Sequence, residues 1–114
     1  MRTGKITRQK LVDVYATAPA KLNGLFPRKG DIAAGSDADL VIFDDTYEGT
    51  MGIKDSLEGG DYCAYEGIEQ KGRVEKVFLR GALTVDGGQF VGKEGQGVLL
   101  KGEPFGSVYE GLCQ

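Results

Sequence analysis

The side chains that could do chemistry in this chain are carboxylates, lysines, tyrosines and two cysteines, because its 114 residues include no histidine. Histidine is the commonest metal ligand and the side chain that most often titrates near neutral pH. Its absence removes the usual member of hydrolytic metal sites and of Ser-His or Cys-His nucleophile systems. Cys63 and Cys113 form no C-x-x-C pair. Two free thiols in a reducing cytoplasm are the simpler prediction, and a disulfide between them is the alternative.

Two groups of acids could in principle form sites. Glu58, Asp61 and Glu66 lie in one irregular stretch, where paired carboxylates could act as general acid and base. Their spacing gives no sign that two of them converge, so we expect solvated loop acids. The other group lacks the spacing and terminal Glu of an EF-hand and is interrupted by an apolar run, so turn capping is expected rather than calcium binding. Its members are Asp37, Asp39, Asp44 and Asp45.

Three other features have a structural and a functional interpretation. The glycines of the run 92–97 resemble a phosphate-binding loop, but no Walker lysine-serine pair ends it, so we expect a turn between strands. Cys63 is expected to be a small packed residue, since no histidine is present to generate a thiolate. The loop and tail aromatics are expected to be packing or interface anchors, because no basic groove accompanies them. They are Tyr62, Tyr65, Phe105 and Tyr109.

The composition is that of one folded domain. Hydrophobic residues make up 40% of the chain, and the formal net charge of −3 comes from acids and bases that are interspersed along it. Such a chain has no basic stripe that would attract nucleic acid. No apolar run approaches the ~18 residues that span a bilayer, and the first residues lead into a polar helix rather than a signal-peptide core. We therefore expect a cytoplasmic protein with neither a nucleic-acid nor a membrane partner.

Two short helices are expected first among the elements that position these residues. Thr7 is a good N-cap. Pro19 is expected to end the first helix by pushing Ala18 out of the α region, and to open a second helix through Leu22 that closes at Gly24. The first helix has apolar residues at positions i, i+3, i+4 and i+7, which form one stripe: Leu11, Val14, Tyr15 and Ala18.

Strands are expected in the rest of the chain. Residues 29–44 combine a glycine-punctuated turn with the apolar strand 40–43 that follows it. Positive φ is expected in the turn, at Gly30 and Gly35. The stretch 46–72 carries no sustained period and is predicted to be a long irregular loop. After it, residues 74–80, 82–85 and 89–91 alternate with glycine turns and predict a three-stranded meander.

The order of several separated motifs resembles the C-terminal signature of the amidohydrolase superfamily. The residues that carry this resemblance are 17–21, Gly24-Leu25, Lys29-Gly30, Gly35 and 38–41. The resemblance narrows to the dihydropyrimidinase and hydantoinase group through 26–30, Asp61-Tyr62, Glu66-Gly67, Arg80-Gly81 and 90–92. It extends from about Ile6 to Phe105.

The resemblance implies a fold and a function. Those enzymes are much longer: a (β/α)8 barrel holds two zinc ions and hydrolyses cyclic amides, and both ends of the chain build a β-sandwich. By this resemblance the present chain is α+β and mainly β, with short N-terminal helices and the C-terminal share of the sandwich, and without the barrel. Catalytic, cofactor-binding and metal-binding residues are then all expected outside it, and zinc is expected only in the full-length family.

The implied organisation has three parts. Residues 1–28 would pack on the missing barrel through Leu11, Val14 and Tyr15. Residues 29–100 would supply the sandwich, which Val41, Phe43, Val77 and Leu79 would fill. Residues 101–114, with Phe105 and Tyr109, would reach a neighbouring subunit.

The expected partners are the missing barrel portion and further copies of the chain, because an incomplete sandwich exposes strand edges and an apolar face. One interpretation is therefore a segment of a cyclic amidohydrolase that is inactive alone. The alternative is a free-standing β-rich interaction module derived from such a domain. A third, weaker possibility is an independent carboxylate enzyme in the loop 46–72.

Overall fold

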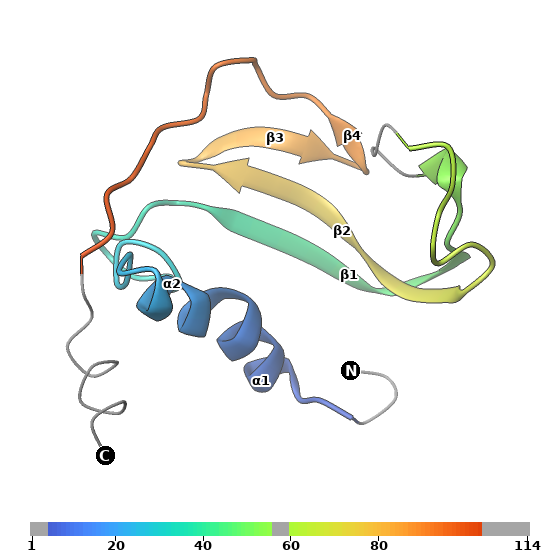
Figure 1. The fold of residues 1–114 in the computed structure, drawn as a ribbon, viewed down its shortest axis with the longest axis horizontal. Coiled ribbons are helices and arrows are strands. Elements are labelled where there is room, and N and C mark those ends of the chain that lie inside the picture. Colours follow the sequence, from blue (N-terminus) through green and yellow to red (C-terminus); the bar gives the residue numbers. More distant parts are fainter. Residues whose placement is uncertain (1–4, 56–59, 104–114) are drawn as a thin grey trace.

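A helical segment and a four-stranded antiparallel sheet make up the structure, a computed structural model that describes residues 5–55 and 60–103. The helical segment consists of α1 (Arg8–Val12), a π-helical turn (Asp13–Thr17) and α2 (Ala18–Leu22). The sheet consists of β1 (Leu40–Thr50), β2 (Glu69–Leu79), β3 (Ala82–Asp86) and β4 (Gln89–Phe90), and a 3-10 turn (Ile53–Asp55) follows β1. Figure 1 shows the helices along one side of the sheet and the segment after β4 returning to the end of α2. The expected mainly β architecture with N-terminal helices is confirmed.

The helical segment begins as expected but does not break where expected. The side chain of Thr7 caps α1 by accepting a hydrogen bond from the Lys10 amide at 3.1 Å. Ala18, however, keeps helical dihedral angles (φ −64°, ψ −45°), so the prediction that Pro19 separates two helices is wrong. The Ala18 amide bonds to the Asp13 carbonyl five residues back. This wider turn carries the helix past a proline that has no N–H to donate.

The sheet is a meander in the order β1-β2-β3-β4, which confirms the three predicted strands and their turns. Val41 lies opposite Val77, and Val77 lies opposite Val85, so one row of apolar side chains crosses β1, β2 and β3. Thr84 interrupts the β2–β3 register and donates its hydroxyl hydrogen to the Val77 carbonyl at 3.0 Å. The bulge therefore re-pairs a backbone group that it would otherwise leave open.

The predicted irregular loop 46–72 is too long at both ends. β1 continues to Thr50 and β2 begins at Glu69, so these residues form a hairpin arm in place of loop. The arm bends where three residues of β1 face one of β2 between the pairs Asp44–Arg73 and Glu48–Lys71. The sequence did not predict this pairing, because the rule for strands requires alternating apolar residues on one buried face and both strands here carry polar residues. A two-stranded arm needs backbone bonds but no apolar side.

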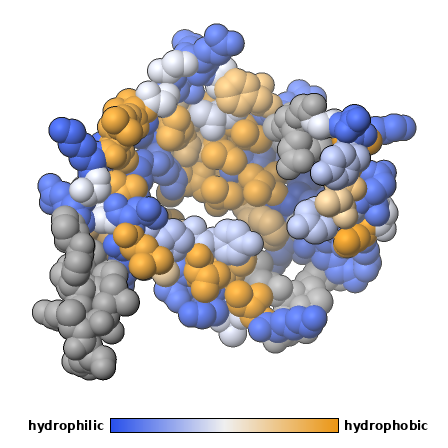
Figure 2. Space-filling view, viewed as in Figure 1, coloured by the Kyte–Doolittle hydropathy of each residue, from blue (hydrophilic) through white to orange (hydrophobic). Residues whose placement is uncertain are grey.

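Very little of the chain is buried. Among the described residues only Ala20, Gly72 and Thr84 are buried, with Ala20 at 6% and Thr84 at 8% exposure. Val41 and Phe43, expected to fill the sandwich, are 61% and 44% exposed. The radius of gyration is 16.7 Å, against about 13 Å for a compact domain of 100 residues. The space-filling view shows apolar surface on the sheet and an opening between the sheet and the helices (Figure 2).

The described helices were compared with the length and hydrophobicity that a membrane span requires. No helix within residues 5–55 and 60–103 is both long enough and apolar enough to span a bilayer. The boundaries of the expected parts 1–28, 29–100 and 101–114 stay a prediction, and most of the last part lies outside the described residues.

Candidate functional site

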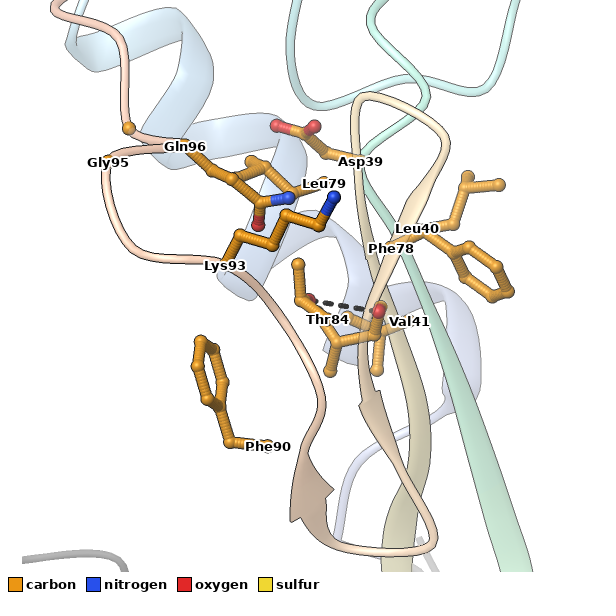
Figure 3. Close-up of a pocket in the computed structure, with 12 residues that line it drawn as sticks. Asp39, Leu40, Val41, Phe78, Leu79, Thr84, Phe90, Lys93, Gly95 and Gln96 are labelled. Atoms are coloured by element: carbon orange, nitrogen blue, oxygen red, sulfur yellow. Dashed lines mark hydrogen bonds between the residues drawn. The ribbon is translucent and has the colours of Figure 1, made fainter.

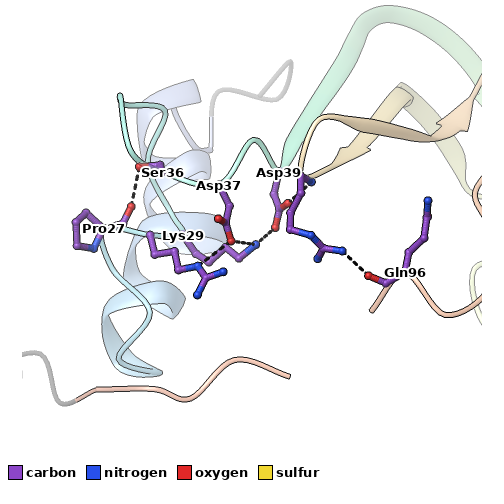
Figure 4. Close-up of polar contacts among 8 residues, drawn as sticks. Pro27, Lys29, Ser36, Asp37, Asp39 and Gln96 are labelled. Atoms are coloured by element: carbon purple, nitrogen blue, oxygen red, sulfur yellow. Dashed lines mark hydrogen bonds and ion pairs between the residues drawn. The ribbon is translucent and has the colours of Figure 1, made fainter. Parts of the chain in front are cut away.

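A polar cluster joins the helical segment to the sheet, and Lys29 is its centre (Figure 4). The Lys29 ammonium group is 2.9 Å from Asp37 Oδ2 and also pairs with Asp39. Arg28 adds a second bond to Asp37 at 3.0 Å. The glycines of the turn 29–36 allow the chain to reverse here, because Gly30 and Gly35 have φ values of +81° and +95° as expected. The reversal places one ammonium group between two carboxylates.

Asp39 extends this cluster into the sheet. Its Oδ1 accepts a hydrogen bond from the Arg80 amide at 2.7 Å, and the Gly81 amide donates to the Ala38 carbonyl at 2.9 Å. Arg80 has φ +47°, a conformation that non-glycine residues rarely adopt. Its guanidinium group bonds the Gln96 carbonyl. The cluster of Lys29, Asp37, Asp39 and Arg80, here called the ionic junction, thus links the helices, the β2–β3 turn and the returning segment.

The junction keeps its groups charged. Burial alone would lower the pKa of Lys29, but its bonds to Asp39 and Asp37 outweigh burial and raise that pKa. The hydrogen bond from Lys29 is the main cause that lowers the pKa of Asp37. Burial would raise the pKa of Asp39, and the bonds from Lys29 and the Arg80 amide overcome it, so this pKa is also lowered. These are the shifts of a structural ion-pair network, in which no group is prepared to exchange protons near neutral pH.

An open groove of about 510 Å³ lies on the sheet beside the junction (Figure 3). Val41, Val77 and Leu79 contribute to its lining, and the returning segment adds Lys93 and Gln96. The close-up shows Leu40 and Phe78 directed to the opposite side of the sheet from Lys93 and Gln96. Both sides of the sheet therefore carry apolar side chains. The groove offers apolar contact area, the cation of Lys93 and the carboxylate of Asp39, which already pairs with Lys29. This is the composition of a docking surface rather than of a reaction site.

The acids considered for calcium do not gather. Asp37 and Asp39 pair with Lys29, whereas Asp44 accepts bonds from its own neighbour Thr46, at 2.9 Å from the amide and 2.7 Å from the hydroxyl. Asp45 pairs with Arg8 of α1. The pKa of Asp44 is lowered chiefly by the Thr46 hydroxyl. The expectation of turn capping is confirmed for Asp44, and the other three acids make ion pairs with basic side chains.

The described loop residues that were considered for catalysis or packing form no catalytic arrangement. Glu66 Oε2 accepts the Ile53 amide at 2.9 Å, so this carboxylate caps the 3-10 turn. Cys63 is a half-buried free thiol, and Asp61 is exposed. Tyr62 and Tyr65 are 76% and 62% exposed. Residues 92–97 form a turn and a loop over the groove, and no helix follows them as far as residue 103. Glu58, Phe105, Tyr109 and Cys113 lie outside the described residues.

The part of the chain that the structure describes has no group of three or more His, Cys, Asp or Glu placed to hold a metal ion. Asp37 and Asp39 share the Lys29 ammonium group. These residues therefore do not fit a binuclear metal centre, and no step of a metal-assisted reaction is assigned to them.

Sequence reasoning missed Lys29 and Arg80, the two cations of the junction. The acids at 37 and 39 were expected to bond neighbouring amides, but Asp39 reaches an amide 41 residues away. Only a pairing of turn 29–36 with turn 80–81 brings these groups together. No pattern of residues within either turn indicated that the two turns lie close together.

Comparison with known proteins identifies the class. A model of the amidohydrolase family matches residues 1–84, and the chain belongs to that family. Its curated relatives include D-hydantoinase of Geobacillus stearothermophilus, 43% identical over 108 residues, which cover 95% of this chain and 23% of that protein.

Solved structures agree with this assignment. D-hydantoinase (dihydropyrimidinase) from Thermus sp. superposes with a TM-score of 0.86 and 48% identity over 91% of this chain and 23% of its own. Dihydropyrimidinase from Brevibacillus agri gives 0.76 and 46%, over 79% and 20%. The chain is thus similar to part of a hydantoinase or dihydropyrimidinase and spans less than a quarter of their length.

Proposed function

We propose that this chain is the C-terminal structural share of a cyclic amidohydrolase, acting on hydantoins or dihydropyrimidines, and that it has no activity alone. The observation that carries the proposal is the match of 95% of this chain to 23% of a D-hydantoinase. In this arrangement zinc and the reacting groups belong to the remaining part of the enzyme. The enzyme as a whole is proposed to be cytoplasmic. The work of this share is to hold that part in shape and to support oligomers.

The open surfaces support this role. The sheet has apolar side chains on both sides, and one side carries the groove beside the ionic junction. Tyr15 and Leu22 of the helical segment are 79% and 71% exposed. A sheet normally buries at least one face against a second layer. We propose that the remaining strands of a composite β-sandwich cover the sheet and that the barrel covers the helices.

Fragment complementation tests this function. The 114-residue chain and the N-terminal three quarters of a related D-hydantoinase are purified separately, and hydantoin and dihydrouracil hydrolysis is assayed with zinc supplied. We expect no turnover and no stoichiometric zinc with this chain alone, and turnover when the two pieces are refolded together. Turnover and bound zinc with this chain alone would contradict the proposal. So would a barrel piece whose activity is the same with and without the chain.

The second candidate function is a free-standing interaction module. The observation that favours it is the hairpin arm, whose end exposes Tyr62 and Tyr65. An in-frame barrel sequence upstream of Met1 in the gene would exclude this alternative, whereas a genuine start signal at Met1 would favour it.

Self-association is proposed under either function. The edge strand β1 is 11 residues long, and the sheet face beside it is open. Exposed edges and apolar faces favour pairing with another copy. The tail 101–114 is a further candidate contact, most of which lies outside the described residues.

A further inference from the structure

We infer that the Asn23–Gly24 peptide is a site of spontaneous deamidation, and that the returning segment, residues 91–103, controls how fast the reaction runs. Asn23 is the only asparagine among the 114 residues, and a glycine follows it directly. The inference goes beyond the proposed function, because the reaction needs neither zinc nor the remaining part of the enzyme.

The reaction uses groups that this peptide already contains. The main-chain nitrogen of Gly24 forms a bond to the side-chain carbonyl carbon of Asn23, the bond from that carbon to Nδ2 breaks, and ammonia leaves with the proton of the Gly24 amide. Water then opens the resulting cyclic imide at either carbonyl group. The product is aspartate, or isoaspartate with the side-chain carbon in the main chain. Glycine favours the reaction, because it has no Cβ atom to hinder the approach of its nitrogen.

The site is exposed to water, but the two reacting groups are held apart. Asn23 is an exposed residue at the C-terminal end of α2. Its ψ angle is 5°, which places the Gly24 nitrogen beside the Asn23 nitrogen and away from the side chain. The Gly24 amide donates to the Lys21 carbonyl at 3.1 Å, and Asn23 Nδ2 donates to the Pro19 carbonyl at 2.8 Å. Ring closure requires the attacking nitrogen to turn toward the side chain and lose its proton, so it breaks the bond from Gly24.

The returning segment holds this peptide in place where it reaches the end of α2 (Figure 1). The Glu103 amide donates to the Gly24 carbonyl at 2.7 Å. Gly102 passes so close that a Cβ atom on it would lie 2.2 Å from the Asn23 carbonyl oxygen. That oxygen belongs to the peptide group that has to rotate, and the rotation also displaces Gly24. Local opening of residues 101–103 is therefore the step that permits deamidation.

Deamidation changes this joint permanently. A carboxylate only accepts hydrogen bonds, so the product loses the bond from residue 23 to the Pro19 carbonyl. The new negative charge lies at the C-terminal end of a helix, where the unpaired carbonyl groups are also negative. A chain whose returning segment has opened is thus marked chemically, and the modified joint closes less well than the original one.

Mass spectrometry of the full chain tests the inference. The tryptic peptide 22–28 contains Asn23, and replacement of its side-chain NH2 by OH is followed over time in mildly alkaline buffer. Gly102→Ala opens the joint without changing the Asn-Gly pair. We expect it to deamidate about tenfold faster than the wild type, because overpacking raises the population of the open joint. The matched control is Gly97→Ala in the same segment, which has no atom within 4 Å of the added carbon and should react at the wild-type rate.

A second opening variant removes a hydrogen bond and adds no bulk beside Asn23. In Glu103→Pro no amide hydrogen remains to bond the Gly24 carbonyl, and deamidation should be about fivefold faster than in the wild type. Circular dichroism shows that each variant keeps its fold, and the wild type unfolded in urea gives the upper limit of the rate. Asn23→Gln should show no conversion over the same time.

The product is tested separately with Asn23→Asp, which has the side chain of one product. We expect hydrogen exchange of the Glu103 amide to be about fivefold faster in this variant, because the joint opens more often. Unchanged exchange would refute the effect of the product on the joint.

Three results would overturn the control by the returning segment. They are a wild type that reacts as fast when folded as in urea, opening variants that react at the wild-type rate, and a Gly97→Ala control that reacts as fast as Gly102→Ala. None of these measurements involves zinc or hydantoin hydrolysis, so failure of this inference and failure of the proposed function are distinguishable.

Discussion

At the scale of single residues, Lys29 is the side chain whose loss should be felt most. Its ammonium group is mostly shielded from solvent and lies between Asp37 and Asp39. We expect Lys29→Met to lower the free energy of unfolding by about 1–2 kcal/mol, because two half-buried carboxylates lose their shared partner. Urea denaturation followed by circular dichroism measures the change. Lys10→Met, which removes only the exposed pair with Asp13, is the matched control and should cost clearly less than Lys29→Met, because solvent screens an exposed pair.

The same residues predict how stability depends on pH. The lowered pKa values of Asp37 and Asp39 contribute stability that is present above their unfolded pKa, near 4, and is lost as pH falls through the folded values. The raised pKa of Lys29 contributes stability that is present below its unfolded pKa, near 10.4, and is lost as pH rises through the folded value. Urea midpoints measured across pH should therefore fall at both extremes. In Asp39→Asn the acid-side fall should be smaller; an unchanged profile would argue against the assignment.

At the scale of elements, Gly72 controls the bend of the hairpin arm. It is buried with φ +90°, and a Cβ atom there would come within 2.6 Å of the Phe43 ring. We expect Gly72→Ala to cost about 1–3 kcal/mol more than Gly67→Ala, because both glycines have positive φ but only Gly72 lacks space. Urea denaturation of the two variants gives the difference. Equal losses would show that the ring moves aside freely.

A second close approach fastens the returning segment to the end of α2. The Glu103 amide donates to the Gly24 carbonyl at 2.7 Å, and a Cβ atom on Gly24 would lie 1.8 Å from the Glu103 carbonyl oxygen. We expect Gly24→Ala to release residues 101–103, seen as faster hydrogen exchange of the Glu103 amide. Gly35→Ala is the control, since its φ is +95° and no atom lies within 4 Å of the added carbon. Protection that persists in Gly24→Ala would contradict this account.

At the scale of the whole molecule, the open surfaces predict how the chain behaves alone. A chain with three buried residues in its described part exposes more apolar surface than a monomeric domain normally tolerates. We expect it to bind the dye anilinonaphthalene sulfonate and to unfold with a low denaturant midpoint. Both properties should change when the complementary barrel piece is added, with loss of dye fluorescence and a higher midpoint. Dye binding that persists in the complex would show that the surfaces are not the ones covered.

Local rules predicted the parts of the fold that depend on neighbours in sequence. Thr7 caps a helix, Gly30 and Gly35 reverse the chain, and the strands after Val74 pair through short glycine turns, all as expected. The same rules failed at Ala18, where a π-helical turn absorbed the proline, and in residues 46–50 and 69–72, where strands formed without an apolar face. In both cases main-chain hydrogen bonds decided the structure. Such bonds do not depend on the side-chain pattern from which the local rules predict helices and strands.

The sequence by itself determined the class of this protein, because motifs from residue 17 to residue 92 occur in the order of an amidohydrolase. It also determined that histidine-dependent metal sites and nucleophile systems lose their usual member in this chain, since its 114 residues include no histidine. Only the tertiary structure decided that Lys29, Asp37, Asp39 and Arg80 form one junction and that the sheet and helices leave apolar surface open. Those facts depend on which segments, far apart in the sequence, come into contact and on which surfaces remain exposed to solvent. The spacing of residues along the chain predicts neither.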